Sequence, residues 1–194
     1  MSEELAEKKN LKNKNVNAAG EKKGEVVVFL RELPILIITA VILAWLIKSF
    51  IVQPFYIPSG SMEPTLYPGD RVLVNKFLYH IQKPNVEDIV VFVPPGIEDK
   101  DYIKRIVALE GEEIEVKSGQ VSVNGKSKNE PYIIDQYNSS SYGPEKVPAR
   151  DVFVMGDNRP NSRDSREFGP LPKKRIVGKA FMIYWPLQRI QLLN

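Results

Sequence analysis

The sequence of 194 residues contains no cysteine and only one histidine, His80. Without cysteine the chain has no disulfide, no thiolate nucleophile and no cysteine-ligated zinc site. A single histidine excludes a His-rich metal site, and a Ser-His-Asp triad is possible only through His80. The net charge of +3 is too small to indicate nucleic-acid binding. No pattern in the sequence indicates a metal or another cofactor, and we expect none.

Long apolar runs are scarce as well, with one exception. Residues 33–52 read LPILIITAVILAWLIKSFIV and contain a single charge, Lys48. About 20 apolar residues suffice for a helix to cross a bilayer, and a lysine near the end can extend to the head groups. A cleavable signal sequence would be followed by a small-residue cleavage site, and a buried core helix would carry more polar residues than Thr39. We therefore expect one transmembrane helix at 33–52.

The residues before this run, 1–32, form a polar tail rich in Lys, Glu and Asn, which we expect to be solvated. Lys22, Lys23 and Arg31 lie shortly before the run. The positive-inside rule counts such residues and places the tail in the cytoplasm. The prediction is a single-pass protein of the cell membrane, with residues 53–194 on the extracytoplasmic side.

After Gln53 the pattern changes to short apolar runs with the alternation of strands. We expect strands at 71–76, 88–93, 102–109, 113–117, 120–123, 152–155 and 176–185. The pair Asn124-Gly125 predicts a tight hairpin turn. No stretch of useful length has helical periodicity, so we predict a mainly β domain. Residues 110–150 would form a smaller β subdomain or insertion, irregular over 126–150.

The stretch PSGSMEPTL places Ser59 and Ser61 shortly after the apolar run. A serine hydroxyl is a poor nucleophile at neutral pH and needs a neighbouring base to accept its proton. The sequence contains neither G-x-S-x-G nor S-x-x-K, and no other residue supports His80 as the base. The remaining candidate is a lysine that burial keeps neutral.

Lys104 is the lysine that fits best, because it lies inside the strand-like segment DYIKRIVAL. Alternation places Lys104 on one face with Tyr102, Ile106 and Ala108, and turns Arg105 to the other face. Spacing alone favours a simpler interpretation, in which Lys104 lies on a half-exposed strand.

A third segment, GDNRPNSRDSREFG at 156–169, is dense in polar and turn-forming residues. Its composition favours a solvated surface loop. The concentration of charged and hydrogen-bonding side chains also permits a scaffold around a site. We interpret His80 as a surface or hairpin residue, and Glu63 and Asp70 as solvated loop residues.

The three segments, in this order after an apolar run, resemble those of the bacterial type I signal peptidases, over about residues 30–185. The resemblance implies a membrane-bound serine endopeptidase. Such an enzyme removes signal peptides from secreted preproteins and cuts after a small residue in an Ala-X-Ala pattern. The implied fold is a signal-peptidase/LexA-like β-rich catalytic core in residues 53–194. The implied partners are preproteins and the lipid bilayer.

The family pattern also implies roles for individual residues. Ser61 would be the nucleophile and Lys104 the general base, while Ser59 would add its hydroxyl to the Ser61 N–H in an oxyanion hole. A supporting group would consist of Ser162, which hydrogen-bonds the lysine, together with Asp164 and Arg166. The apolar substrate pockets would draw on Phe55, Ile57, Met62, Leu66, Val72, Tyr102 and Ile103.

One position departs from the family pattern, since Pro160 stands where the family often has an acidic residue. Two other functions are compatible with parts of the sequence. A self-cleaving repressor-like protease shares the Ser-Lys dyad, but it would carry a DNA-binding domain and its own cleavage site. A membrane-tethered β domain that binds a partner without catalysis would leave Ser61 and Lys104 as ordinary residues. The presence of both favours the enzyme.

Overall fold

The structure, a computed structural model, describes residues 32–45, 51–133 and 140–193. The chain divides into two compact units, Met1–Ile47 and Lys48–Asn194. In the first unit, residues 32–45 form a helix. No helix within the described ranges is long and apolar enough to cross a membrane.

The predicted transmembrane run, 33–52, is thus described only in part. Its first residues belong to the helix, residues 46–50 lie outside the described residues, and Val52 opens a strand. The predicted tail, 1–32, lies outside the described residues except for Glu32.

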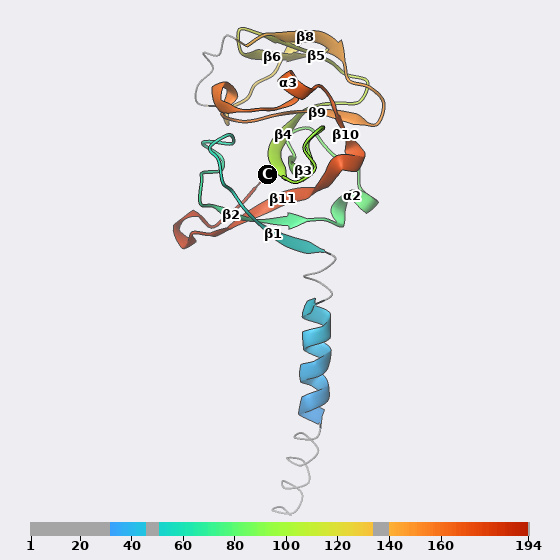
Figure 1. The fold of residues 1–194 in the computed structure, drawn as a ribbon, viewed down its shortest axis with the longest axis vertical. Helices are drawn as coiled ribbons and strands as arrows, with labels where there is room; N and C mark the ends of the chain where they lie inside the picture. Colours follow the sequence, from blue (N-terminus) through green and yellow to red (C-terminus); the bar gives the residue numbers. More distant parts are fainter. Residues whose placement is uncertain (1–31, 46–50, 134–139, 194) are drawn as a thin grey trace, which may run out of the picture. The chain divides into compact units, whose positions relative to one another are not determined.

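The second unit contains two antiparallel sheets (Figure 1). The larger sheet has the order β1-β2-β11-β3-β4-β9-β10, with β12 paired to β11. Its strands are β1 (Val52–Tyr56), β2 (Arg71–Asn75), β3 (Ile89–Phe92), β4 (Tyr102–Leu109), β9 (Asp151–Met155), β10 (Leu171–Pro172), β11 (Ile176–Trp185) and β12 (Gln191–Leu192).

The smaller sheet has the order β7-β6-β5-β8. Its strands are β5 (Glu113–Lys117), β6 (Gln120–Val123), β7 (Lys126–Ser127) and β8 (Tyr142–Lys146). Short helical turns connect the strands: α2 (Leu78–Ile81), α3 (Ser165–Phe168), η1 (Arg159–Asn161), η2 (Lys173–Arg175) and η3 (Leu187–Arg189). The prediction of a mainly β domain is confirmed.

The core lies on both faces of the larger sheet, as β3 shows. All four residues of β3 are buried between β11 and β4. Ile89 and Val91 enter one apolar cluster with residues of β2 and β11, while Val90 and Phe92 enter another with residues of β4 and β9. Successive strand residues point to opposite faces, so a strand covered on both sides is apolar throughout.

Each of the seven predicted strands is present, with bounds that differ by one residue at most. The predicted turn follows β6, where Asn124 and Gly125 have positive φ angles of 51° and 73°. The segment 126–150, predicted to be irregular, contains β7 and also β8, which pairs with β5. The smaller sheet lies within 110–150, whose limits as a subdomain stay a prediction.

A bulge in β4 alters one expected face. The register between β4 and β9 shifts between Ile106 and Ala108. Ile106 joins the cluster that Tyr102 contacts, whereas Ala108 packs with Val107 in a different cluster. The expectation that Ala108 shares a face with Lys104 was wrong, because an inserted residue interrupts strict alternation.

Candidate active site

Ser61 lies in a turn between β1 and β2, and the residues around it fix this turn. Met62 and Leu66 are fully buried in the core, and the Leu66 N–H donates to the Met62 carbonyl over 2.9 Å. The Glu63 N–H donates to the Gly60 carbonyl over 3.1 Å. Ser61 itself is buried, with 9% of its surface exposed. The apolar anchors after Ser61 therefore hold a polar side chain against the body of the domain.

Lys104 enters the same place from β4. Its Nζ lies 2.7 Å from the Ser61 Oγ and donates to the Ile103 carbonyl over 2.9 Å. Only 3% of Lys104 is exposed. The interpretation of Lys104 as a residue of a half-exposed strand was therefore wrong. The structure brings together the two residues that the sequence singled out, 43 positions apart.

Burial lowers the pKa of Lys104 from 10.5 to about 8, because the charged ammonium loses its hydration. The carboxylates of Asp164 and Asp157 act in the opposite direction, and the Arg166 guanidinium lowers the pKa further. With a pKa of about 8, about half of the Lys104 amines are neutral at pH 8, against about 0.3% for an ordinary lysine. A neutral amine at this distance can accept the proton of a serine hydroxyl.

The dyad faces a cavity of about 460 Å³. Its lining consists of Pro58, Ser59, Ser61, Lys100, Asp101, Tyr102, Ile103, Lys104, Asn161 and Arg163. Ser59, predicted for the oxyanion hole, is exposed and lines the same cavity as Ser61. Of the predicted pocket residues, Tyr102 and Ile103 are among the lining residues.

The other predicted pocket residues belong to the core. Ile57, Met62, Leu66 and Val72 are at most 2% exposed and pack in one apolar cluster, against which Phe55 also packs. None of the five lines the cavity, so the assignment is corrected for the four buried residues, while that of half-buried Phe55 stays a prediction. An apolar residue near a nucleophile can either contact substrate or anchor the nucleophile's loop, and sequence does not separate the two.

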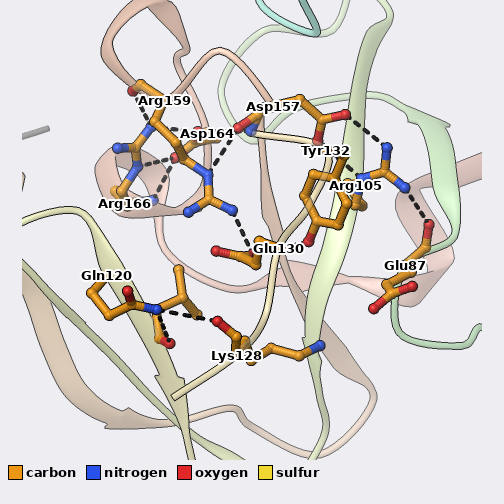
Figure 2. A network of polar contacts seen from close by, with 12 residues as sticks. Glu87, Arg105, Gln120, Lys128, Glu130, Tyr132, Asp157, Arg159, Asp164 and Arg166 are labelled. Atoms are coloured by element: carbon orange, nitrogen blue, oxygen red, sulfur yellow. Dashed lines mark hydrogen bonds and ion pairs between the residues drawn. The ribbon is translucent and has the colours of Figure 1, made fainter. Parts of the chain in front are cut away.

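The polar segment 156–169 is not a solvated loop. Asp157, at its start, is 2% exposed and accepts two hydrogen bonds from Arg105, over 2.9 Å from Nε and 2.7 Å from Nη2. The Thr65 hydroxyl donates to the same carboxylate over 2.5 Å. The guanidinium of Arg105 lies over the ring of Tyr132 at 4.0 Å (Figure 2). A paired, hydrogen-bonded charge can be buried where a lone one cannot.

Further along the segment, Asp164 and Arg166 form a second buried pair. Asp164 is fully buried, accepts from the Gly156 N–H over 3.0 Å and receives two hydrogen bonds from the Arg166 guanidinium, each 2.8 Å long. Arg166 also donates to the Arg159 carbonyl over 2.7 Å, and Arg159 is paired with Glu130 over 2.6 Å (Figure 2). These contacts fix the shape of the loop, while a role in supporting the dyad stays a prediction.

Ser162 does not make the predicted hydrogen bond to Lys104. Its Oγ is buried, and no described residue bonds it. The hydroxyl is turned against Gly156, and a Cβ added to Gly156 would collide with it and would come within 2.5 Å of the Ser61 carbonyl oxygen. The absence of a side chain at Gly156 therefore allows the polar segment to approach the nucleophile's turn.

Two further predictions concern His80 and Asp70. His80 is exposed and lies on α2, as expected for a surface residue. Asp70, predicted to be solvated, is 2% exposed and accepts a hydrogen bond from the Arg189 Nε over 2.9 Å. This prediction was wrong because its partner lies 119 positions away.

Sequence reasoning missed Arg105, Thr65 and Asn158 as parts of the site. Asn158 donates from its Nδ2 to the Gly60 carbonyl over 2.9 Å and from its backbone N–H to the Ser61 carbonyl over 3.2 Å. The available signal was the density of polar residues in 156–169, which does not show which side chain contacts the serine turn.

Comparison with known proteins places the chain in a family. The family model described as signal peptidase, peptidase S26, matches residues 30–185. The chain belongs to this signal peptidase family. It is 44% identical over 162 residues to a probable signal peptidase I-2 of Synechocystis sp., covering 81% of this chain and 74% of that one. It is 38% identical over 169 residues to signal peptidase I S of Bacillus subtilis, covering 81% and 90%.

The present chain matches a crystal structure of a signal peptidase I from Enterococcus faecalis with a TM-score of 0.46 and 29% identity. The match covers 51% of this chain and 97% of that one. Membership of the family makes the protein a serine endopeptidase that removes signal peptides. The family and the activity predicted from the three segments are thereby confirmed.

Proposed function

We propose that this signal peptidase cuts preproteins with Ser61 as the nucleophile and neutral Lys104 as the general base. The observation that carries the proposal is the 2.7 Å separation of Lys104 Nζ and Ser61 Oγ at the wall of a cavity. A nucleophile and its base must lie within about 2.6–3.2 Å of each other. The lowered pKa of Lys104 adds support, because it makes the neutral form accessible near pH 8.

The reaction has two stages. In the first, Lys104 takes the Ser61 proton as Oγ bonds to the carbonyl carbon of the scissile peptide. The tetrahedral intermediate then breaks its C–N bond, Lys104 returns the proton to the departing amine, and an ester to Ser61 remains. In the second stage Lys104 takes a proton from water, whose oxygen attacks the ester carbonyl carbon. Collapse releases the signal peptide's carboxyl end and gives the proton back to Ser61.

Both stages place negative charge on the carbonyl oxygen, which needs hydrogen-bond donors. We assign this role to the Ser61 N–H and the Ser59 hydroxyl. Ser59 lies on the wall of the same cavity and is exposed, so its hydroxyl is free to rotate toward a bound substrate. Asp164 and Arg166 would act at a distance by holding the polar segment in place. Ser162 would support the same arrangement through its buried hydroxyl, which lies beside Gly156.

The substrates we propose are preproteins with a small residue at the cleavage site, in an Ala-X-Ala pattern. Tyr102 and Ile103 supply apolar surface to the cavity, against which a small apolar side chain would pack. We also propose that residues 33–52 anchor the enzyme as a single span, with the N-terminus in the cytoplasm. This rests on the run's length, its one charge and the basic residues before it.

The test is cleavage of a preprotein with an Ala-X-Ala site by the full-length enzyme in detergent. The native chain should cut after the second alanine, and Ser61→Ala and Lys104→Ala should each lower the rate by at least about 10³-fold. His80→Ala is the matched control and should keep the native rate, since His80 is an exposed residue of α2. A cut at the same bond that persists in Ser61→Ala would refute the proposed nucleophile.

A further inference from the structure

Asn158 contacts the chain on both sides of Ser61 without facing the substrate cavity. Its Nδ2 donates to the carbonyl before Ser61, that of Gly60, and its backbone N–H donates to the carbonyl of Ser61 itself. Asn158 is absent from the described lining of the dyad's cavity. It lines a separate hollow of about 200 Å³ with Glu63 and Tyr67. Asn158 therefore contacts the serine turn from a side other than the one that faces the dyad's cavity.

The bond to Gly60 constrains the group that would bind the oxyanion. A trans peptide unit is planar, so the carbonyl of Gly60 and the N–H of Ser61 point in opposite directions. Holding this carbonyl toward Asn158 turns the Ser61 N–H away from Asn158. No described residue accepts a hydrogen bond from that N–H, which leaves it available to a ligand. A flip of the peptide would remove the donor and present a carbonyl oxygen in its place.

The neighbours of Asn158 fix its position in the fold. Asp157 before it is held by Arg105, and Arg159 after it by Glu130, in two buried ion pairs. Two residues earlier, Gly156 lies so close to Ser61 that a Cβ would come within 2.5 Å of the Ser61 carbonyl oxygen. Groups whose own positions are locked by packing and ion pairs can hold a catalytic group within the tolerance that catalysis needs.

We infer that Asn158 is a positioning residue, which orients the Gly60–Ser61 peptide so that the Ser61 N–H points into the oxyanion site. The inference rests on the proposed function, because it takes Ser61 as the nucleophile. It assigns Asn158 no contact with substrate. The side chain acts on the rate only through the peptide that it holds.

Two substitutions test the inference in the full-length enzyme, with kcat and KM measured on the same preprotein. Loss of one oxyanion donor lowers kcat by about 10²–10³-fold. In Asn158→Ala the Glu63 N–H still holds the Gly60 carbonyl, so we expect a smaller loss, about 10–100-fold, with KM within about threefold. Asn158→Asp should lose more, because a carboxylate oxygen would then face the Gly60 carbonyl oxygen and repel it.

The pH profile separates this role from damage to the dyad. In Asn158→Ala the midpoint of the rise in kcat/KM with pH should stay at the native value, because the substitution adds no charge near Lys104. Asn158→Asp places a new carboxylate near Lys104, which raises the lysine pKa, so only the alanine variant is used for this comparison. Asn75→Ala is the matched control. It removes an asparagine side chain that accepts from the Phe77 and Leu78 N–H groups, away from the site, and should leave kcat native.

Rates are referred to the folded fraction of each variant, measured by circular dichroism. Native kcat in folded Asn158→Ala and Asn158→Asp would overturn the inference, and so would a loss in Asn158→Ala accompanied by a shifted pH midpoint. Ser61→Ala is measured beside them. Cleavage by Ser61→Ala would refute the proposed function, whereas an inactive Ser61→Ala with fully active Asn158 variants would refute the inference alone.

Discussion

The buried lysine predicts a measurable conflict between stability and activity. The difference between an ordinary lysine pKa of 10.5 and the value of about 8 for Lys104 corresponds to about 3 kcal/mol, at about 1.4 kcal/mol for each pH unit. Because the pKa is lower in the folded state, the unfolded chain binds more protons between pH 8 and 10.5. The free energy of unfolding due to this group therefore rises with pH across that window. Below pH 8 the folded protein carries the full destabilisation of about 3 kcal/mol.

Replacement of Lys104 by methionine, which cannot titrate, removes this dependence. We expect the native free energy of unfolding to fall relative to that of Lys104→Met by about 2–3 kcal/mol as the pH is lowered from 10 to 7. Urea unfolding of both full-length proteins in the same detergent, followed by circular dichroism at several pH values, measures it. Comparing the two proteins cancels the titration of all other groups.

The variant should also be inactive on the preprotein at every pH, since it keeps the shape of the side chain but has no base. A difference in stability that stays constant between pH 7 and 10 would refute the lowered pKa of Lys104. A gain of stability without loss of activity would refute its role as the base.

Other substitutions test the polar segment behind the dyad. Gly156→Ala places a Cβ within 2.5 Å of the Ser61 carbonyl oxygen, so it should destabilise the fold by about 1–3 kcal/mol and lower the cleavage rate. A native free energy of unfolding together with a native cleavage rate would show that the turn can shift freely. Asp157→Ala leaves the buried Arg105 unpaired and should lower the free energy of unfolding, measured with urea, by about 3–5 kcal/mol. Glu167→Ala, which breaks an exposed ion pair, should change stability by less than about 1 kcal/mol, and equal losses in the two variants would contradict the importance of burial.

Much of the fold could be predicted, because apolar alternation marks strands that cover a core. The runs at β2, β3 and β11 show this, and so does the turn at Asn124 and Gly125. β8 escaped prediction because its sequence, YGPEK, lacks alternating apolar residues. It is a strand through its pairing with β5, which local sequence does not reveal.

The site was predicted in part. Family resemblance brought Ser61 and Lys104 together, while spacing alone favoured a Lys104 on a half-exposed strand. Both faces of β4 are covered, so Lys104 and the adjacent Arg105 are each buried. Arg105 is buried through its pairing with Asp157, 52 positions away, and such long-range partners are invisible to local patterns. Met62, assigned to a substrate pocket, instead anchors the serine turn in the core.

The dependence of kcat/KM on pH tests the central claim, a serine activated by a neutral lysine, most directly. For the native enzyme with a preprotein substrate, the rate should rise with the loss of a single proton and a midpoint near pH 8, the pKa of buried Lys104. The same curve should be obtained with His80→Ala. A midpoint near about 6.5, the ordinary pKa of histidine, that disappears in His80→Ala would contradict the account.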